Sequence, residues 1–241
     1  MSTAATAPRL ALNAERRFFS ATALTGLAVT VVGFAPTWFL MRWSGAPPLP
    51  WLVHIHGAVY TAWIGLYLAQ TTLIATGQRD LHRKLGQSAI AIAVVMVVLG
   101  YFVAIEGARR GAGPPGRDQL AFLTNPLSNI LTFTALLSAA IYQRHRAPYH
   151  KRLMLLTMLP ILTTPLARLS RMLGSPYEGF VGGRLLADLF LVALAVYDIS
   201  TKGRLHPATL WGGSFLLASE AARVLISGTQ TWRTFAAWLI A

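Results

Sequence analysis

Long apolar segments constrain the fold of this chain more than any other feature of its sequence. Each is close to the roughly 20 residues that a helix needs to cross the hydrocarbon core of a bilayer. A backbone in lipid must satisfy its own hydrogen bonds, which favours helices. We therefore predict an all-α integral membrane protein, a bundle of seven transmembrane helices at about 20–42, 50–74, 87–107, 121–143, 151–171, 182–200 and 208–227.

The composition agrees with a membrane protein. Of the 241 residues, 54% are hydrophobic and only 12% are charged, whereas soluble domains carry about 25% charged residues. The first apolar segment is too long for the core of a signal peptide, so we expect it to be retained as a helix. Residues 1–19 then form a cytoplasmic N-terminal segment, 20–227 the membrane domain and 228–241 a C-terminal tail.

The basic residues predict the orientation. With the N-terminus in the cytoplasm and the C-terminus outside, twelve Lys or Arg flank the cytoplasmic ends of the segments and seven flank the outer ends, as the positive-inside rule favours. The cytoplasmic set is Arg9, Arg16, Arg17, Arg79, Arg83, Lys84, Arg144, Arg146, Lys151, Arg152, Lys202 and Arg204, and the outer set is Arg42, Arg109, Arg110, Arg117, Arg171, Arg184 and Arg233.

The net charge of +13 could suit nucleic acid, but no basic soluble domain is present to carry such binding. Nucleic acid is therefore not a predicted partner. The expected location is the inner, cytoplasmic membrane of a bacterial cell, with membrane lipids as partners. The pattern of residues predicts no oligomeric state.

The segment 50–74 carries a polar and aromatic stripe. Steps of three and four residues from His56 reach Tyr60, Trp63, Tyr67 and Gln70. We expect this stripe to face the bundle interior, because lipid cannot satisfy its hydrogen-bonding groups. His54 lies two residues before His56 and points away from this face. The alternative is that the stripe packs the bundle, with its hydroxyl groups bonded to neighbouring helices.

Arg168 lies at a depth similar to that of His56 in the predicted topology. Neither residue has an acidic partner at helical spacing within its own segment. We predict that His56 donates or accepts a proton and that Arg168 holds an anionic group of a substrate or ligand. Arg168 could instead extend toward lipid headgroups together with Arg171.

Other segments bring polar groups to the same outer half of the predicted bundle, and these are candidate ligand-binding residues. Glu106 is at this level as well. Arg184 and Asp188, like Glu220 and Arg223, also have spacings that allow a pair within one helix. The complete set of predicted ligand-binding residues is Tyr60, Trp63, Tyr67, Gln70, Asn125, Asn129, Asp188, Glu220 and Arg223.

Two histidines, His82 and His150, lie at equal depth on the cytoplasmic side of the predicted topology. Histidines from two helices at one level could be the axial ligands of a b-type haem. Each begins a helix beside two cations, so phospholipid phosphates would suit the same place. No other cofactor and no metal site is predicted. A retinal Schiff base is excluded because Lys84, Lys151 and Lys202 lie in loops or at helix ends.

The elements LHRKLG (81–86) and YHKRLM (149–154), followed by Arg168, resemble a family of uncharacterised prokaryotic multi-helix membrane proteins with a domain of unknown function. Those proteins carry a histidine in an early helix, an H-R-x-L-G element, and an H-R-x-x-M element that leads into a helix with an arginine. The matching positions are His54 or His56, His82, Arg83, Leu85, Gly86, His150, Met154 and Arg168. The resemblance covers about residues 50–170 and implies a multi-helix membrane fold without a known activity.

Taken together, these features predict a polar pocket in the outer half that binds a small or lipid-like ligand, in a membrane-embedded enzyme or a carrier. One alternative is a b-type haem redox protein that uses His82 and His150. The other is a non-catalytic assembly or sensor subunit in which the polar residues hold the helices together.

Overall fold

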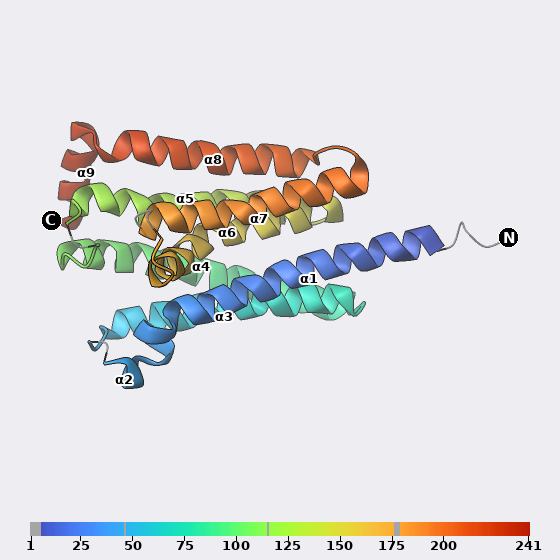
Figure 1. The fold of residues 1–241 in the computed structure, drawn as a ribbon, viewed down its shortest axis with the longest axis horizontal. Coiled ribbons are helices and arrows are strands. Elements are labelled where there is room, and N and C mark those ends of the chain that lie inside the picture. The colour runs from blue at the N-terminus through green and yellow to red at the C-terminus, as the bar shows by residue number, and fades with distance from the viewer. Residues whose placement is uncertain (1–5, 46, 115, 176–178) are drawn as a thin grey trace. The chain divides into compact units, whose positions relative to one another are not determined.

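The computed structural model describes residues 6–45, 47–114, 116–175 and 179–241. These residues form helices joined by short loops, without a strand among them (Figure 1). The long helices are α1 (Thr6–Phe34), α3 (Trp51–Ala75), α4 (Arg79–Arg109), α5 (Gln119–Tyr142), α6 (Ala147–Met172), α7 (Gly179–Lys202) and α8 (Pro207–Ser227). The short ones are the π-helix η1 (Ala35–Phe39), α2 (Met41–Ser44) and α9 (Gln230–Ile240).

Within the described residues, five helices are long and apolar enough to cross a membrane: α1 from Asn13 together with η1, then α3, α4, α5 and α6. The prediction of an all-helical chain with membrane-spanning segments is confirmed at this level. The two remaining predicted segments are helical as α7 and α8, and each contains charged residues, such as Arg184 in α7 and Arg223 in α8. The predicted tail contains a further helix, α9.

The chain divides into two compact units. Unit 1 contains Met1–Pro48, Gly57–Val94 and Leu162–His206, and unit 2 contains Leu49–His56, Val95–Ile161 and Pro207–Ala241. The division falls within α3, α4 and α6, so each of these helices contributes residues to both units. Of the five candidate spans, α6 is by far the most buried.

In unit 1, two glycines bring helices into close backbone contact. A Cβ atom at Gly33 of α1 would overlap the backbone of Pro165 in α6, and one at Gly183 of α7 would overlap the backbone of Ala167. Small residues allow this approach, which is the usual way for membrane helices to gain packing contacts. The second half of α6 is therefore tightly held by α1 and α7.

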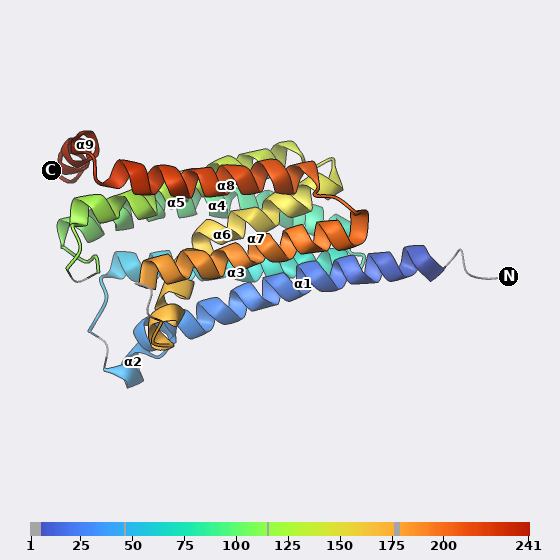
Figure 2. The same ribbon diagram turned by 45° about the horizontal axis from the view of Figure 1, so that its top comes forward.

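In unit 2, α5 and α8 lie side by side (Figures 1 and 2). Thr132 of α5 donates a hydrogen bond to Ser219 of α8 at 3.2 Å. Gly212 of α8 leaves room for the side chain of Leu156 in α6. The short helix α9 turns across the end of this pair and is seen nearly along its axis in Figure 2.

Candidate functional site

Arg168 lies near the end of α6, at the same end of unit 1 as η1. Its Nη1 donates a hydrogen bond to the Thr37 hydroxyl at 2.7 Å. Its guanidinium carbon lies 4.7 Å from the centre of the Phe34 ring, which is the geometry of a cation–π contact. The side chain is partly buried. A cation in this position is held by a hydroxyl group and an aromatic ring.

The π-helix η1 explains how Thr37 reaches Arg168. Pro36 has no N–H and disturbs the regular hydrogen bonds of the helix it follows. The wider turn is closed by the N–H of Leu40, which donates to the carbonyl oxygen of Ala35 at 2.7 Å. A π-turn changes the direction of the residues after it and is frequent at functional sites. Thr37 lies in the middle of this turn.

No carboxylate of the described residues forms an ion pair with Arg168. The next charged residue along α6, one turn on, is Arg171, which is exposed and also positive. The end of α6 thus combines a partly buried cation with a second cation nearby. Such an arrangement favours a negatively charged group.

Unit 1 also contains buried polar atoms that no described residue satisfies. They are the Trp38 indole N–H, one side-chain oxygen of Gln70 and one carboxylate oxygen of Asp188. The Trp38 ring packs where Gly57 of α3 has no side chain. Buried polar groups in native proteins nearly always have a hydrogen-bond partner. Unit 1 therefore has unused donors and acceptors for a polar ligand or for water.

The stripe on α3 contains the predicted residues His56, Tyr60, Trp63, Tyr67 and Gln70. Trp63 and Tyr67 are buried, and the other three are partly buried. The Gln70 amide lies against Gly86 of α4 within unit 1. His56 is assigned to unit 2 and Arg168 to unit 1. The expectation that these two residues serve one site therefore stays a prediction.

The predicted residues of unit 2 lie on α5 and α8. Asn125 and Asn129 are partly buried on α5, Glu220 is partly buried on α8, and Arg223 is buried on α8. The Asn125 amide donates to the carbonyl oxygen of Phe122 in its own helix at 3.1 Å. This bond gives Asn125 a structural role. In unit 1, Asp188 follows Arg184 by one turn of α7.

Glu106 pairs within its own helix. Its carboxylate accepts a hydrogen bond from Arg110 at 2.6 Å, one turn further along α4. A pair at this spacing neutralises the carboxylate locally. Glu106 is therefore accounted for without a ligand.

The two candidate haem ligands begin α4 and α6. His150 of unit 2 lies 2.8 Å, through Nδ1, from the carbonyl oxygen of Ala140 at the end of α5. His82 of unit 1 is partly buried in the first turn of α4. Across the described ranges, no group of three or more His, Cys, Asp or Glu side chains is arranged to hold a metal ion.

Sequence reasoning did not identify Phe34, Thr37 and Trp38 as part of this site. The signal that could have pointed to them is Pro36, because a proline within an apolar segment marks a disturbed turn. Comparison with known proteins adds no assignment: no family model, no curated protein and no solved structure matches this chain.

Proposed function

We propose that this chain is a membrane protein whose Arg168 site binds the anionic group of a small or lipid-like molecule. The observation that carries the proposal is the partly buried Arg168 guanidinium, held by the Thr37 hydroxyl and the Phe34 ring. A guanidinium has several N–H donors in a planar fork that suits carboxylate and phosphate groups. The hydrogen bond to Thr37 uses one of them. An anionic ligand would satisfy the others and neutralise the charge.

The buried polar atoms of unit 1 support a ligand with polar groups besides its anion. The indole N–H of Trp38, the residue after Thr37 in η1, offers a donor, and Asp188 of α7 offers an oxygen acceptor. In an enzyme, the predicted role of His56 would be proton transfer. In a carrier, the same residues would bind and release the ligand without reaction. The proposal covers both, because Arg168 holds the anion in each case.

We propose further that α7 and α8 also cross the membrane, which gives seven spans with the N-terminus in the cytoplasm of a bacterial cell and the C-terminus outside. Their 24 and 21 residues extend about 36 and 32 Å at 1.5 Å per residue, enough for a hydrocarbon core of about 30 Å. The excess of basic residues at the predicted cytoplasmic ends supports this orientation.

The binding proposal is tested by thermal unfolding in detergent with chemically defined probes. Decanoate and dihexanoyl phosphatidylglycerol provide a carboxylate and a phosphate, and decanol is the neutral control. We expect both anionic probes, but not decanol, to raise the Tm. A probe at 100 times its Kd stabilises a protein by about 2.7 kcal/mol. Arg168→Gln should lose this response, whereas Arg171→Gln, a matched change at the exposed arginine, should keep it.

Thr37→Val is the second variant for the same measurement. It removes the acceptor that positions Arg168 but keeps the positive charge. We expect a weaker response to the anionic probes, and we expect Thr37→Ser to restore it. A response of equal size in the wild-type protein and in Arg168→Gln would contradict the proposal.

A second candidate function is that of a b-type haem protein. The observation in its favour is the contact between His150 Nδ1 and the Ala140 carbonyl oxygen at 2.8 Å. Metal-binding histidines usually donate one ring nitrogen to such an oxygen and use the other for the metal. The chain's own residues for this role would be His82 and His150. A Soret band in the purified protein that disappears in His82→Ala and His150→Ala would support this function, and a protein without a Soret band would exclude it.

A further inference from the structure

The C-terminal helix α9 has one face packed against its own unit. Thr229 caps its start by accepting a hydrogen bond from the Trp232 N–H at 3.2 Å. Ala236 is fully buried in a small core with Ile105 of α4 and Leu123 of α5. Trp232, Leu239 and Ile240 pack around this core. α9 is therefore an ordered part of unit 2.

Three polar contacts hold α9 against the end of α4 and the start of α5. The Trp232 indole N–H donates to the carbonyl oxygen of Leu120 at 2.7 Å, and Arg109 donates to the carbonyl oxygen of Ile240 at 2.8 Å. Arg233 forms an ion pair with Asp118. The partners of α9 are thus the last residue of α4 and the first residues of α5, including its N-cap, Asp118.

Two candidate membrane spans, α4 and α5, have their ends at this position. Both α4 and α5 are long and apolar enough to cross a membrane, so their joined ends mark the edge of the hydrocarbon core. Figure 2 shows α9 directed across α5 and α8 rather than along them. A helix in this position lies parallel to the membrane surface at the boundary between lipid and water.

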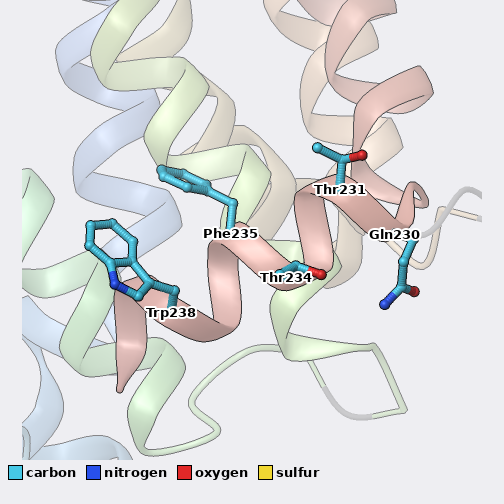
Figure 3. A pocket seen from close by; sticks show the side chains of 5 residues that line it. All are labelled: Gln230, Thr231, Thr234, Phe235 and Trp238. Atoms are coloured by element: carbon cyan, nitrogen blue, oxygen red, sulfur yellow. The ribbon is translucent and has the colours of Figure 1, made fainter.

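A second face of α9 carries exposed aromatic side chains. Phe235 is 45% exposed and Trp238 is 71% exposed. Together with Gln230, Thr231 and Thr234 they line a shallow groove of about 580 Å³ (Figure 3). Aromatic rings beside hydroxyl and amide groups are typical of helices at the membrane interface, where Trp is enriched.

The charges at this end of unit 2 are complementary to phosphate. Arg109, Arg110, Arg117 and Arg233 lie on α9 or in and beside the loop between α4 and α5, with Glu106 and Asp118 as the carboxylates of the same region. Four positive and two negative side chains leave a net charge of +2. Basic residues beside an amphipathic helix attract the anionic headgroups of phospholipids.

We propose that α9 is an interfacial helix whose groove binds phospholipid headgroups, with Phe235 and Trp238 inserted at the level of the headgroup–acyl boundary. The two helices that α9 contacts, α5 and α8, also carry largely exposed apolar side chains, Leu131 and Leu225. This inference is independent of the Arg168 site, because it depends only on residues of unit 2.

The chain contains no cysteine, so a spin label can be attached at single introduced cysteines in the full-length protein. The protein is reconstituted into nanodiscs of phosphatidylcholine and phosphatidylglycerol, and label depth is measured from the accessibility to oxygen and to a water-soluble nickel complex. Trp238→Cys reports on the aromatic face, and Ala237→Cys, which is exposed on another side of the helix, is the matched control. Leu131→Cys, on the exposed side of α5, provides the reference for the hydrocarbon core.

We expect the ratio of oxygen to nickel accessibility at Trp238→Cys to be severalfold higher than at Ala237→Cys and lower than at Leu131→Cys. Phe235→Cys should give the same result and serves as the second site if Trp238→Cys destabilises the protein. Equal ratios at the two faces of α9 would overturn the proposal. Dipolar broadening between labels at Trp238→Cys would overturn it as well, because a second copy of the chain would then cover this face.

Discussion

The Asn125 side chain replaces a backbone hydrogen bond that the next residue, Pro126, cannot make. Pro126 has no N–H, so the carbonyl oxygen of Phe122, four residues earlier, loses the donor that a regular helix provides. The Asn125 amide donates to this oxygen at 3.1 Å. The sequence predicted Asn125 as a ligand-binding residue because polar groups at that depth are costly in lipid. The local hydrogen bond offsets part of that cost without any ligand.

This role predicts a coupling between the two positions. Asn125→Ala should lower the free energy of unfolding by about 1 kcal/mol, the usual value of one hydrogen bond. In a Pro126→Ala background the same change should have little effect, because the introduced N–H can donate to the Phe122 oxygen. Unfolding in detergent measures all four proteins of this double-mutant cycle.

The control for the cycle is Ser138→Ala, an exposed position on α5 that should leave stability unchanged in both backgrounds. If Asn125→Ala has the same effect with and without Pro126, the amide acts on something other than the Phe122 oxygen. A direct role in ligand binding would then regain support.

At the scale of elements, hydrophobic length predicts where helices lie but not how they contact each other. The predicted segments 50–74 and 121–143 correspond to α3 (Trp51–Ala75) and α5 (Gln119–Tyr142), because span length is a local property of composition. The apolar pattern over 20–42 predicts one continuous helix. The structure ends α1 at Phe34 and continues with η1.

That difference explains why the surroundings of Arg168 were only partly predictable. Helical steps along 151–171 identify Arg168 as a polar residue without a partner in its own helix. Its contact with Thr37 depends on the wide turn of η1, which a pattern with a period of about 3.6 residues does not contain. α9 was not predicted because its 11 residues are too few for a span.

The close approach of α7 to α6 gives a prediction at this scale. A Cβ atom at Gly183 would overlap the backbone of Ala167, which cannot move aside as a flexible side chain can. We expect Gly183→Ala to destabilise the protein by about 3 kcal/mol, or to prevent folding, since overpacking a tight contact is costly. Yield and unfolding in detergent provide the measurement.

Gly65 of α3 is the matched control, because nothing lies within 4 Å of the position that a Cβ would occupy there. Gly65→Ala should be neutral or stabilise the helix by up to about 1 kcal/mol, since alanine favours helix more than glycine. Similar losses at both positions would mean that α6 and α7 are not packed through Gly183.

At the scale of the whole molecule, the open question is whether α7 crosses the membrane, because this decides whether Asp188 is a candidate functional residue. Arg168 is near the end of α6, and Asp188 and the buried Tyr197 follow on α7. If α7 crosses the bilayer, Asp188 lies within hydrocarbon depth, where an ionisable residue is expensive and is a candidate for function. If α7 stays outside, Asp188 is a partly buried residue at water depth, where a carboxylate is far less costly.

Cysteine scanning in intact bacterial cells separates these two topologies, because the chain has no cysteine of its own. We expect a membrane-impermeant maleimide to label Ala112→Cys in the loop before α5 and Gln230→Cys on α9 from outside. His145→Cys, before α6, and Arg204→Cys, between α7 and α8, should react only after lysis. All four positions are exposed, so a missing signal reports the side of the membrane rather than burial. Labelling of Arg204→Cys in intact cells, with His145→Cys still protected, would reduce the protein to five spans and remove Asp188 from the membrane.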